Sequence, residues 1–269
     1  MESLEHVYFS SINDEVDEYI STNPIFPKSI KSLKICYINE SNVIDDDLLV
    51  YNTIDASYIN LNSLTIITNK MLENLSSGMT NLQEIEIKNI YNLDNAKLVD
   101  FLKFNPQLRK LDTDNINYNE EILKVILSSK YLEHWSINSG SWEHVEINNL
   151  PSNCSIKYLR INSSMPDSLI LHLINFCKSL KTLELEINRD FNYLGWSKLE
   201  RRVNKLKLVY NRQTLNGIKE IDALGLFNSV HVEIDPYTKD DINKHIDFKL
   251  NNYKVIFSTS KTYSLKLIN

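Results

Sequence analysis

The sequence is poor in the residues that punctuate all-β folds and disulfide-rich domains. Five glycines and six prolines occur in 269 residues, whereas sandwiches and barrels need turn residues about every 8–12 positions. Three cysteines, Cys36, Cys154 and Cys177, are too few and too scattered for a disulfide framework. Their scarcity favours a reducing compartment, and we expect a cytoplasmic or nuclear protein.

Long apolar runs and an excess of positive charge are also missing. No run of about 18 apolar residues occurs, so no membrane-spanning helix is expected, and the first residues lack the basic and apolar regions of a secretory signal. The formal net charge of −6 disfavours nucleic acid as a partner. The 42 % hydrophobic and 24 % charged residues are typical of a globular protein.

A short motif recurs along the chain. It consists of an apolar residue, two variable residues, a second apolar residue, one variable residue and a third apolar residue. In the regular part its first positions are Leu82, Leu108, Leu132, Ile156, Leu180, Val203 and Phe227. The steps between them are 26, 24, 24, 24, 23 and 24 residues. Looser copies begin at Leu4, Ile30 and Leu61. A step this constant indicates an internal repeat.

The segments between the motifs have helical spacing. Their apolar residues recur at the intervals of one helix face: Leu98, Phe101 and Leu102; Ile122, Val125 and Ile126; Leu169, Leu173, Ile174 and Cys177. Asp167 is expected to cap one of these helices. Each unit is therefore predicted to contain a strand, a turn, a helix and a return. The runs 253–259 and 263–268 are β-rich and predict a terminal hairpin or capping strand pair.

This motif and step resemble the leucine-rich-repeat superfamily over Leu4 to about Val232. The resemblance implies an α/β solenoid, a curved right-handed horseshoe with a parallel sheet on its concave face. Ile90 and Ile116 stand where the usual asparagine or cysteine is expected, which favours irregular repeats. The phrase FLKFNPQLRKL, residues 101–111, is similar to fungal F-box leucine-rich-repeat proteins.

One domain, 1–269, is expected, with irregular repeats in 1–81, regular repeats in 82–250 and a β cap in 251–269. Strand side chains alternate, so the residues between the apolar motif positions should face outward on the concave side. The candidate partner-binding residues are Glu84, Glu86, Asp112, Asp114, His134, Tyr158, Arg160, Glu184, Glu186, Lys205 and Lys207. The first four form an acidic band that predicts a protein partner with a basic patch. The alternative is that all of these residues form a solvated sheet face.

Sequence signatures of catalysis and of cofactor or metal binding are absent. There is no phosphate-binding glycine loop, no G-x-S-x-G, no H-E-x-x-H and no C-x-x-C. We therefore expect no enzyme activity, no cofactor and no metal ligand. Cys177 is expected to be a buried small hydrophobe and Trp135 a core residue. Trp142 and Trp196 are expected on the buried helix side, with an exposed anchor as the alternative.

Three functions remain open at this stage. The first is substrate recognition for an F-box-type ubiquitin ligase, although no F-box is visible before the first motif at Leu4. The second is a ubiquitin-independent interaction scaffold. The third is a regulator, either a GTPase activator or an enzyme inhibitor, for which fold alone is no argument. We expect a monomer or one member of a hetero-complex.

Overall fold

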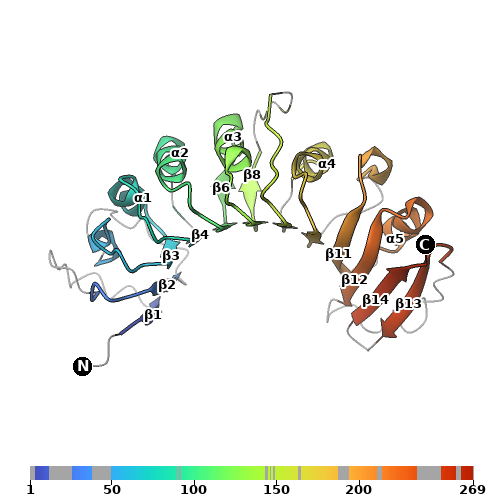
Figure 1. The fold of residues 1–269 in the computed structure, drawn as a ribbon, viewed down its shortest axis with the longest axis horizontal. Helices are drawn as coiled ribbons and strands as arrows, with labels where there is room; N and C mark the ends of the chain where they lie inside the picture. Colours follow the sequence, from blue (N-terminus) through green and yellow to red (C-terminus); the bar gives the residue numbers. More distant parts are fainter. Residues whose placement is uncertain are drawn as a thin grey trace.

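A single open sheet of twelve strands organises the molecule. The computed structural model describes residues 4–11, 26–37, 50–88, 90, 92–142, 145, 147, 149–162, 165–186, 194–210, 214–234, 250–258 and 262–268. Figure 1 shows the strands along the inner side of an arc and the helices along its outer side. The chain is thus an α/β protein with a large, mostly parallel sheet, as the sequence predicts.

The sheet follows the chain almost in sequence order. Its parallel strands are β1 (His6–Ser11), β2 (Ser32–Tyr37), β3 (Ser63–Ile66), β4 (Glu84–Ile87), β5 (Lys110–Thr113), β7 (His134–Ile137), β9 (Tyr158–Ile161), β10 (Thr182–Leu185), β11 (Val203–Tyr210) and β12 (Phe227–Ile234). The register aligns the middle apolar residue of every motif from β4 onward: Ile85, Leu111, Trp135, Leu159, Leu183, Leu206 and Val230. The motif alignment predicted from the sequence is therefore the alignment of the strands.

The helices lie on one side of this sheet. They are η2 (Val50–Thr53), α1 (Asn69–Leu75), α2 (Asn95–Phe104), α3 (Glu120–Ser128), α4 (Asp167–Phe176), η4 (Trp196–Lys198) and α5 (Thr214–Leu224). Capping side chains begin the first three α-helices, since Thr68, Asp94 and Asn119 each accept a backbone amide hydrogen bond. Asp167 does not cap α4; it is the first helical residue and Pro166 stands at the cap without a side-chain bond. That prediction was wrong.

Not every unit contains a full helix. Between β7 and β9 the described residues form no helix but a short strand, β8 (Gly140–Ser141), which pairs with β6 (Ile116–Asn117) in a separate parallel ladder. Between β10 and β11 the described residues contain only the short helix η4. The expectation of one helix per unit was wrong for the unit between β7 and β9, whereas residues 187–193 of the unit between β10 and β11 lie outside the described ranges. No helix in the described ranges has the length and apolarity needed to cross a membrane.

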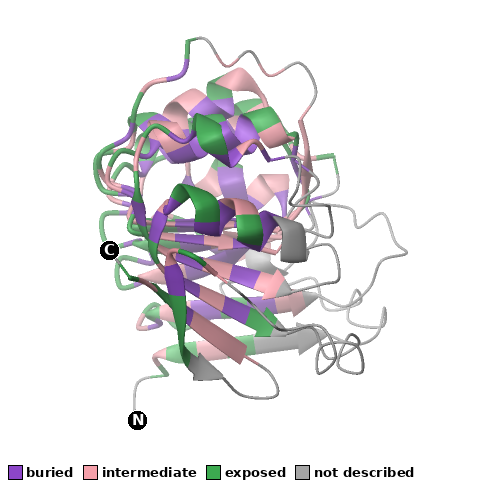
Figure 2. Cartoon of the chain, turned by 90° about the vertical axis from the view of Figure 1, so that its right-hand side faces the viewer, coloured by how far each residue is buried: buried purple, intermediate pink, exposed green. Residues whose placement is uncertain are grey.

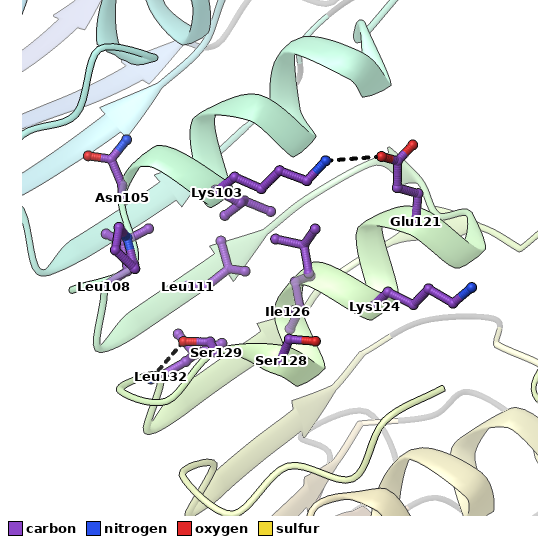
Figure 3. A pocket seen from close by; sticks show the side chains of 13 residues that line it. Lys103, Asn105, Leu108, Leu111, Glu121, Lys124, Ile126, Ser128, Ser129 and Leu132 are labelled. Carbon is purple, nitrogen blue, oxygen red and sulfur yellow. Dashed lines mark hydrogen bonds and ion pairs between the residues drawn. The ribbon is translucent and has the colours of Figure 1, made fainter. Parts of the chain in front are cut away.

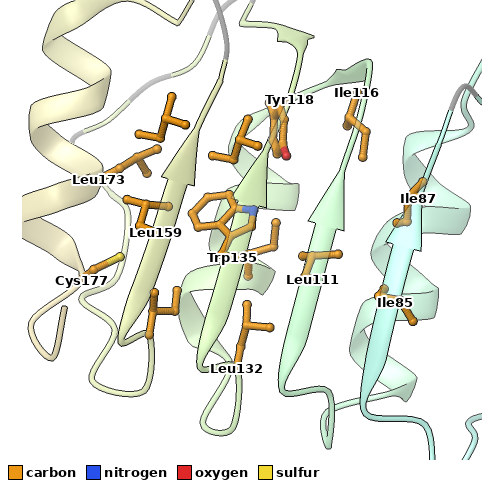
Figure 4. Close-up of a cluster of buried hydrophobic side chains, with 14 of the residues drawn as sticks. Ile85, Ile87, Leu111, Ile116, Tyr118, Leu132, Trp135, Leu159, Leu173 and Cys177 are labelled. Atoms are coloured by element: carbon orange, nitrogen blue, oxygen red, sulfur yellow. The ribbon is translucent and has the colours of Figure 1, made fainter. Parts of the chain in front are cut away.

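The core fills the space between the sheet and the helices. Figure 2 shows buried residues in both the strands and the helices, alternating with intermediate and exposed ones along each element. Figure 4 shows Trp135 at the centre of this core, beside Tyr118 and Leu159. Trp135 and Trp196 are fully buried, as expected. Trp142 is partly buried and stacks on Tyr118, with ring centroids 4.2 Å apart.

A hairpin closes the C-terminal end of the sheet. β13 (Tyr253–Ser258) and β14 (Thr262–Leu267) pair antiparallel, and β14 also pairs antiparallel with β12. The carboxylate of Asp222 accepts the backbone amides of Asn251, Asn252 and Tyr253 at 2.7–3.1 Å and so holds the start of the hairpin against α5. The predicted strand pair at this end is confirmed.

Candidate protein-binding face

The side chains between the apolar motif positions form the inner face of the arc, which we call the concave face. Along β4, β5, β9 and β10 buried residues alternate with half-buried or exposed ones. The apolar motif residues occupy the buried positions, so the intervening residues point away from the helices. All of the candidate residues predicted from the sequence lie on this face.

Three strands contribute to a polar cluster at the middle of the concave face. The register places Tyr158 beside Thr182, Arg160 beside Glu184, and Glu184 beside Lys207. Glu184 Oε2 accepts a hydrogen bond from the Tyr158 hydroxyl at 2.7 Å and lies 2.8 Å from Lys207 Nζ. Its other oxygen, Oε1, lies 3.4 Å from Arg160 Nε. We call Tyr158, Arg160, Glu184, Glu186 and Lys207 the Glu184 cluster.

Opposing effects determine the ionisation of Glu184. Burial alone would raise the pKa of its carboxyl group, but hydrogen bonds from Lys207 and Tyr158, together with the positive charges of Lys207 and Arg160, outweigh it and lower that pKa. Burial and the hydrogen bond to Glu184 raise the pKa of Tyr158 well above its usual range. The carboxylate therefore stays ionised and the phenol stays neutral at physiological pH.

Arg160 connects this carboxylate to Glu186. Its Nη2 lies 2.7 Å from Glu186 Oε2, and this hydrogen bond is the main reason that the pKa of the guanidinium is raised. The ring of His134 lies on the neighbouring strand, 5.4 Å from the Tyr158 ring centroid to centroid. One aromatic surface and an ordered arginine are thus held in place before any partner arrives.

The predicted acidic band is arranged differently. Glu86 Oε1 contacts Lys88 Nζ at 2.7 Å, and Glu84 lies 3.8 Å from Lys110. Asp112 accepts a hydrogen bond from the Asn138 amide at 2.7 Å. A serine hydroxyl from the next unit, that of Ser139, donates to Asp114. Glu84 and Glu86 therefore form ion pairs with lysines, whereas the hydrogen bonds to Asp112 and Asp114 come from neutral donors.

Asp112 lies beside Glu86 in the register of β4 and β5. Burial, followed by the negative charge of Glu86, raises the pKa of its carboxyl group; the hydrogen bond from Asn138 acts in the opposite direction. The positive charges of Lys110 and Arg160 also lower this pKa, but burial and Glu86 outweigh them, so the band contains one carboxylate that is partly disfavoured as an anion.

Some residues of the face were not in the candidate set. Lys88 partly neutralises the acidic band, and Ser139 orients Asp114 from a loop after β7. His231 lies 2.9 Å, Nδ1 to Oγ, from Ser264 on β14, and burial is the main cause of its lowered pKa. The pairing of β14 with β12 carries no signal in the repeat motif, so this contact could not be inferred. Lys205 lies between Thr182 and Ser229 in the register.

No group of three metal-ligating side chains occurs among the described residues. Cys177 is buried, and burial raises the pKa of its thiol to about 12, which suits the small hydrophobe predicted and not a nucleophile. No protein-family model matches the chain, and no curated protein is similar to it.

Proposed function

We propose that the chain is a leucine-rich-repeat solenoid that binds a protein partner on its concave face. The constant step of the motif and the shared register of the parallel strands support the repeat assignment. The backbone hydrogen bonds at the starts of the strands repeat as well. The amides of Gln83 and Glu84 both donate to Asn62 O, and those of Arg109 and Lys110 both donate to Gln83 O. Recurrence in side-chain pattern and in backbone hydrogen bonding is what a stack of equivalent units produces.

The Glu184 cluster is the observation that carries the binding proposal. Tyrosine and arginine are enriched among residues that dominate interface energies, because each combines a large contact area with hydrogen bonds. Here both are already ordered by ionised or hydrogen-bonded neighbours. Ordered side chains lose less conformational entropy when a partner binds. A solvated face without a partner would not require this order.

The acidic band supports a basic patch on the partner. Asp112 and Asp114 have neutral donors as their hydrogen-bond partners, and Asp112 is repelled by Glu86. A lysine or arginine placed over these carboxylates would relieve that repulsion. Complementary charge of this kind increases the association rate and the specificity more than the affinity.

The test begins with affinity capture of the full chain from its native cell and identification of the bound protein. Binding of the purified partner is then measured for Tyr158→Ala with Arg160→Ala, and separately for Asp112→Asn with Asp114→Asn. We expect at least about a tenfold loss of affinity for the first pair, because hot-spot residues contribute about 2 kcal/mol or more. The second pair should mainly slow association and reduce its salt dependence.

The control lies on the helix side, where Lys70→Ala and Glu73→Ala remove an exposed ion pair within α1. This double variant should bind the partner as the unmodified chain does. Full affinity after loss of Tyr158 and Arg160 would place the interface elsewhere and contradict the proposal.

The ubiquitin-ligase reading is a narrower form of the same proposal. It rests on the resemblance of residues 101–111 to fungal F-box leucine-rich-repeat proteins. It predicts that the full-length protein co-purifies with ligase scaffold subunits, and their absence would leave a ubiquitin-independent scaffold. A GTPase-activation assay with purified small GTPases tests the regulatory alternative.

A further inference from the structure

The turns that precede the strands form a row along one edge of the sheet, and side chains tie neighbouring turns together. Asn105 Oδ1 accepts the Met79 amide at 2.8 Å, while its Nδ2 donates to Leu75 O at 3.2 Å. Two units later Asn153 Nδ2 donates to Leu127 O and Ser129 O, at 2.9 and 2.8 Å. Each asparagine thus supplies hydrogen-bond donors to carbonyls at the end of the preceding helix or in the preceding turn.

Other residue types do the same at other turns. The guanidinium of Arg201 donates to Cys177 O and to Leu180 O, just after α4. The hydroxyl of Tyr58 donates to Phe26 O at 3.0 Å. A donor from the following unit is therefore the usual occupant of the space beside these turns.

The turn at Ser129 is different. Ser129 stands three residues before its motif, as Asn105 and Asn153 do before theirs, but its hydroxyl accepts only the Leu132 amide of its own turn, at 3.2 Å. Residues 92–142 are all described, and within them no hydrogen bond joins 128–131 to 104–107.

A cleft of about 490 Å³ opens at this place, between α2 and α3. Its apolar walls are Leu102, Leu108, Leu111, Val125, Ile126 and Leu132. Figure 3 shows Leu108, Leu111, Ile126 and Leu132 below an ion pair that joins the two helices, in which Lys103 Nζ lies 3.2 Å from Glu121 Oε1. The volume is within the usual range of about 300–1,000 Å³ for ligand sites.

The surroundings of the cleft favour a donor with positive charge. Both α2 and α3 end beside it, and helix C-termini carry partial negative charge. Asn153 already donates to Leu127 O at the end of α3, and Asn105 donates to Phe101 O near the end of α2, so the later carbonyls of α2 are the ones open to a further donor. The lysines of the cleft are already paired, Lys103 with Glu121 and Lys124 with Glu120.

We propose that this cleft binds an arginine side chain presented by a partner protein next to a large apolar residue. The aliphatic stem and the apolar neighbour would contact the leucine and valine walls, and the guanidinium would donate to carbonyls at the end of α2, as Arg201 does at the end of α4. The site lies on the helix side, so the proposal goes beyond concave-face binding and does not depend on it.

The probe is the acetylated, amidated tripeptide leucine–arginine–leucine, titrated into the isotope-labelled full chain and followed by methyl NMR. Norleucine in place of arginine gives a matched probe without donors. We expect the methyl signals of Leu102, Leu111, Ile126 and Leu132 to shift, with affinity for the norleucine peptide at least about tenfold weaker, as for loss of a charged hydrogen bond. Equal affinity for the two peptides, or shifts confined to other residues, would overturn the proposal.

A substitution that fills the site gives a second readout. Ser129→Asn introduces the residue found at positions 105 and 153. Its side-chain amide should take the place of the peptide's guanidinium and so weaken binding of the arginine peptide at least about fivefold. Ser197→Asn, an exposed serine on η4, is the matched control and should leave the affinity unchanged. Unchanged affinity in a folded Ser129→Asn variant would contradict the proposal. Should that variant fail to fold, the comparison of the two peptides on the native chain still decides.

Discussion

The row of turns and the concave face both contain many polar side chains, but these side chains differ in burial and in the groups they bind. In the turns the polar groups of Asn105 and Asn153 are buried and bind backbone groups of the preceding unit. On the face Arg160, Glu184 and Glu186 are partly exposed and bind one another. A buried amide without a partner is costly, whereas a half-exposed ion pair contributes little. Substitutions in the turns should therefore reduce stability more than substitutions on the face.

The largest effect on stability is expected in the turns. Asn153→Ala removes bonds to Leu127 O and Ser129 O and leaves the amides of Ser155 and Ile156 without their acceptor. The free energy of unfolding should fall by about 2–4 kcal/mol, since several buried groups lose partners. Urea denaturation measures the loss. Ser129→Ala at the equivalent position should change it by about 0.5 kcal/mol or less, and similar losses for both variants would break the contrast within the turns.

A smaller effect is expected at the centre of the face. Glu184→Gln removes the charge that contacts Lys207 and Arg160 and should reduce stability at pH 7 by less than about 1 kcal/mol, as for other partly exposed ion pairs. The pKa of Glu184 is lowered in the folded chain, so its contribution is present above the unfolded pKa and is lost as pH falls through the folded one.

Urea denaturation of both chains at pH 7 and at pH 3 measures this contribution. The difference between them should be smaller at the lower pH. If Glu184→Gln reduced the free energy of unfolding more than Asn153→Ala does, the face would contribute more to stability than the turn.

The smallest effect has the opposite sign. Asp112→Asn removes repulsion with Glu86 and should increase stability at pH 7 by about 0.2–1 kcal/mol, the range for cross-strand charge pairs. Because the pKa of Asp112 is raised in the folded chain, its unfavourable contribution develops as pH rises above the unfolded pKa. The gain should be absent in acid and complete at neutral pH, which thermal unfolding across that range can check. Loss of stability at pH 7 would show that the carboxylate is needed for the fold.

Much of the sheet could be predicted because its signal is local. The two-residue alternation of the motif and its constant step determine which side chains are buried and which strands are neighbours, and both are visible in the sequence. Among the described residues between β7 and β9, the short strand β8 stands in place of a helix. This could not be predicted, because β8 pairs with β6 through only two residues of each strand and such a short ladder leaves no recognisable sequence pattern. The apolar spacing predicted that α4 begins just after Asp167. The helix begins one residue earlier, so Asp167 is its first residue and not its cap.

The candidate face was predictable in position and not in pairing. Strand alternation places Tyr158, Arg160 and Glu184 on one face, but nothing in the sequence shows that Glu184 is shared by three side chains. The acidic band also looked more uniform than it is, because Lys88 and Ser139 lie outside the strands that define it. Pairings between long side chains depend on rotamers, and a motif does not encode these.

The C-terminal hairpin has a consequence for assembly. A parallel strand such as β12 with a free edge could accept β1 of a second molecule, and such head-to-tail contacts repeat without closing into a ring. Here β14 covers β12 in the opposite direction, and β13 at the outside is irregular between Val255 and Phe257. The row of amides and carbonyls that a strand from another molecule would need is therefore interrupted. The hairpin therefore opposes the addition of another molecule, and so the growth of a filament, at that end of the sheet.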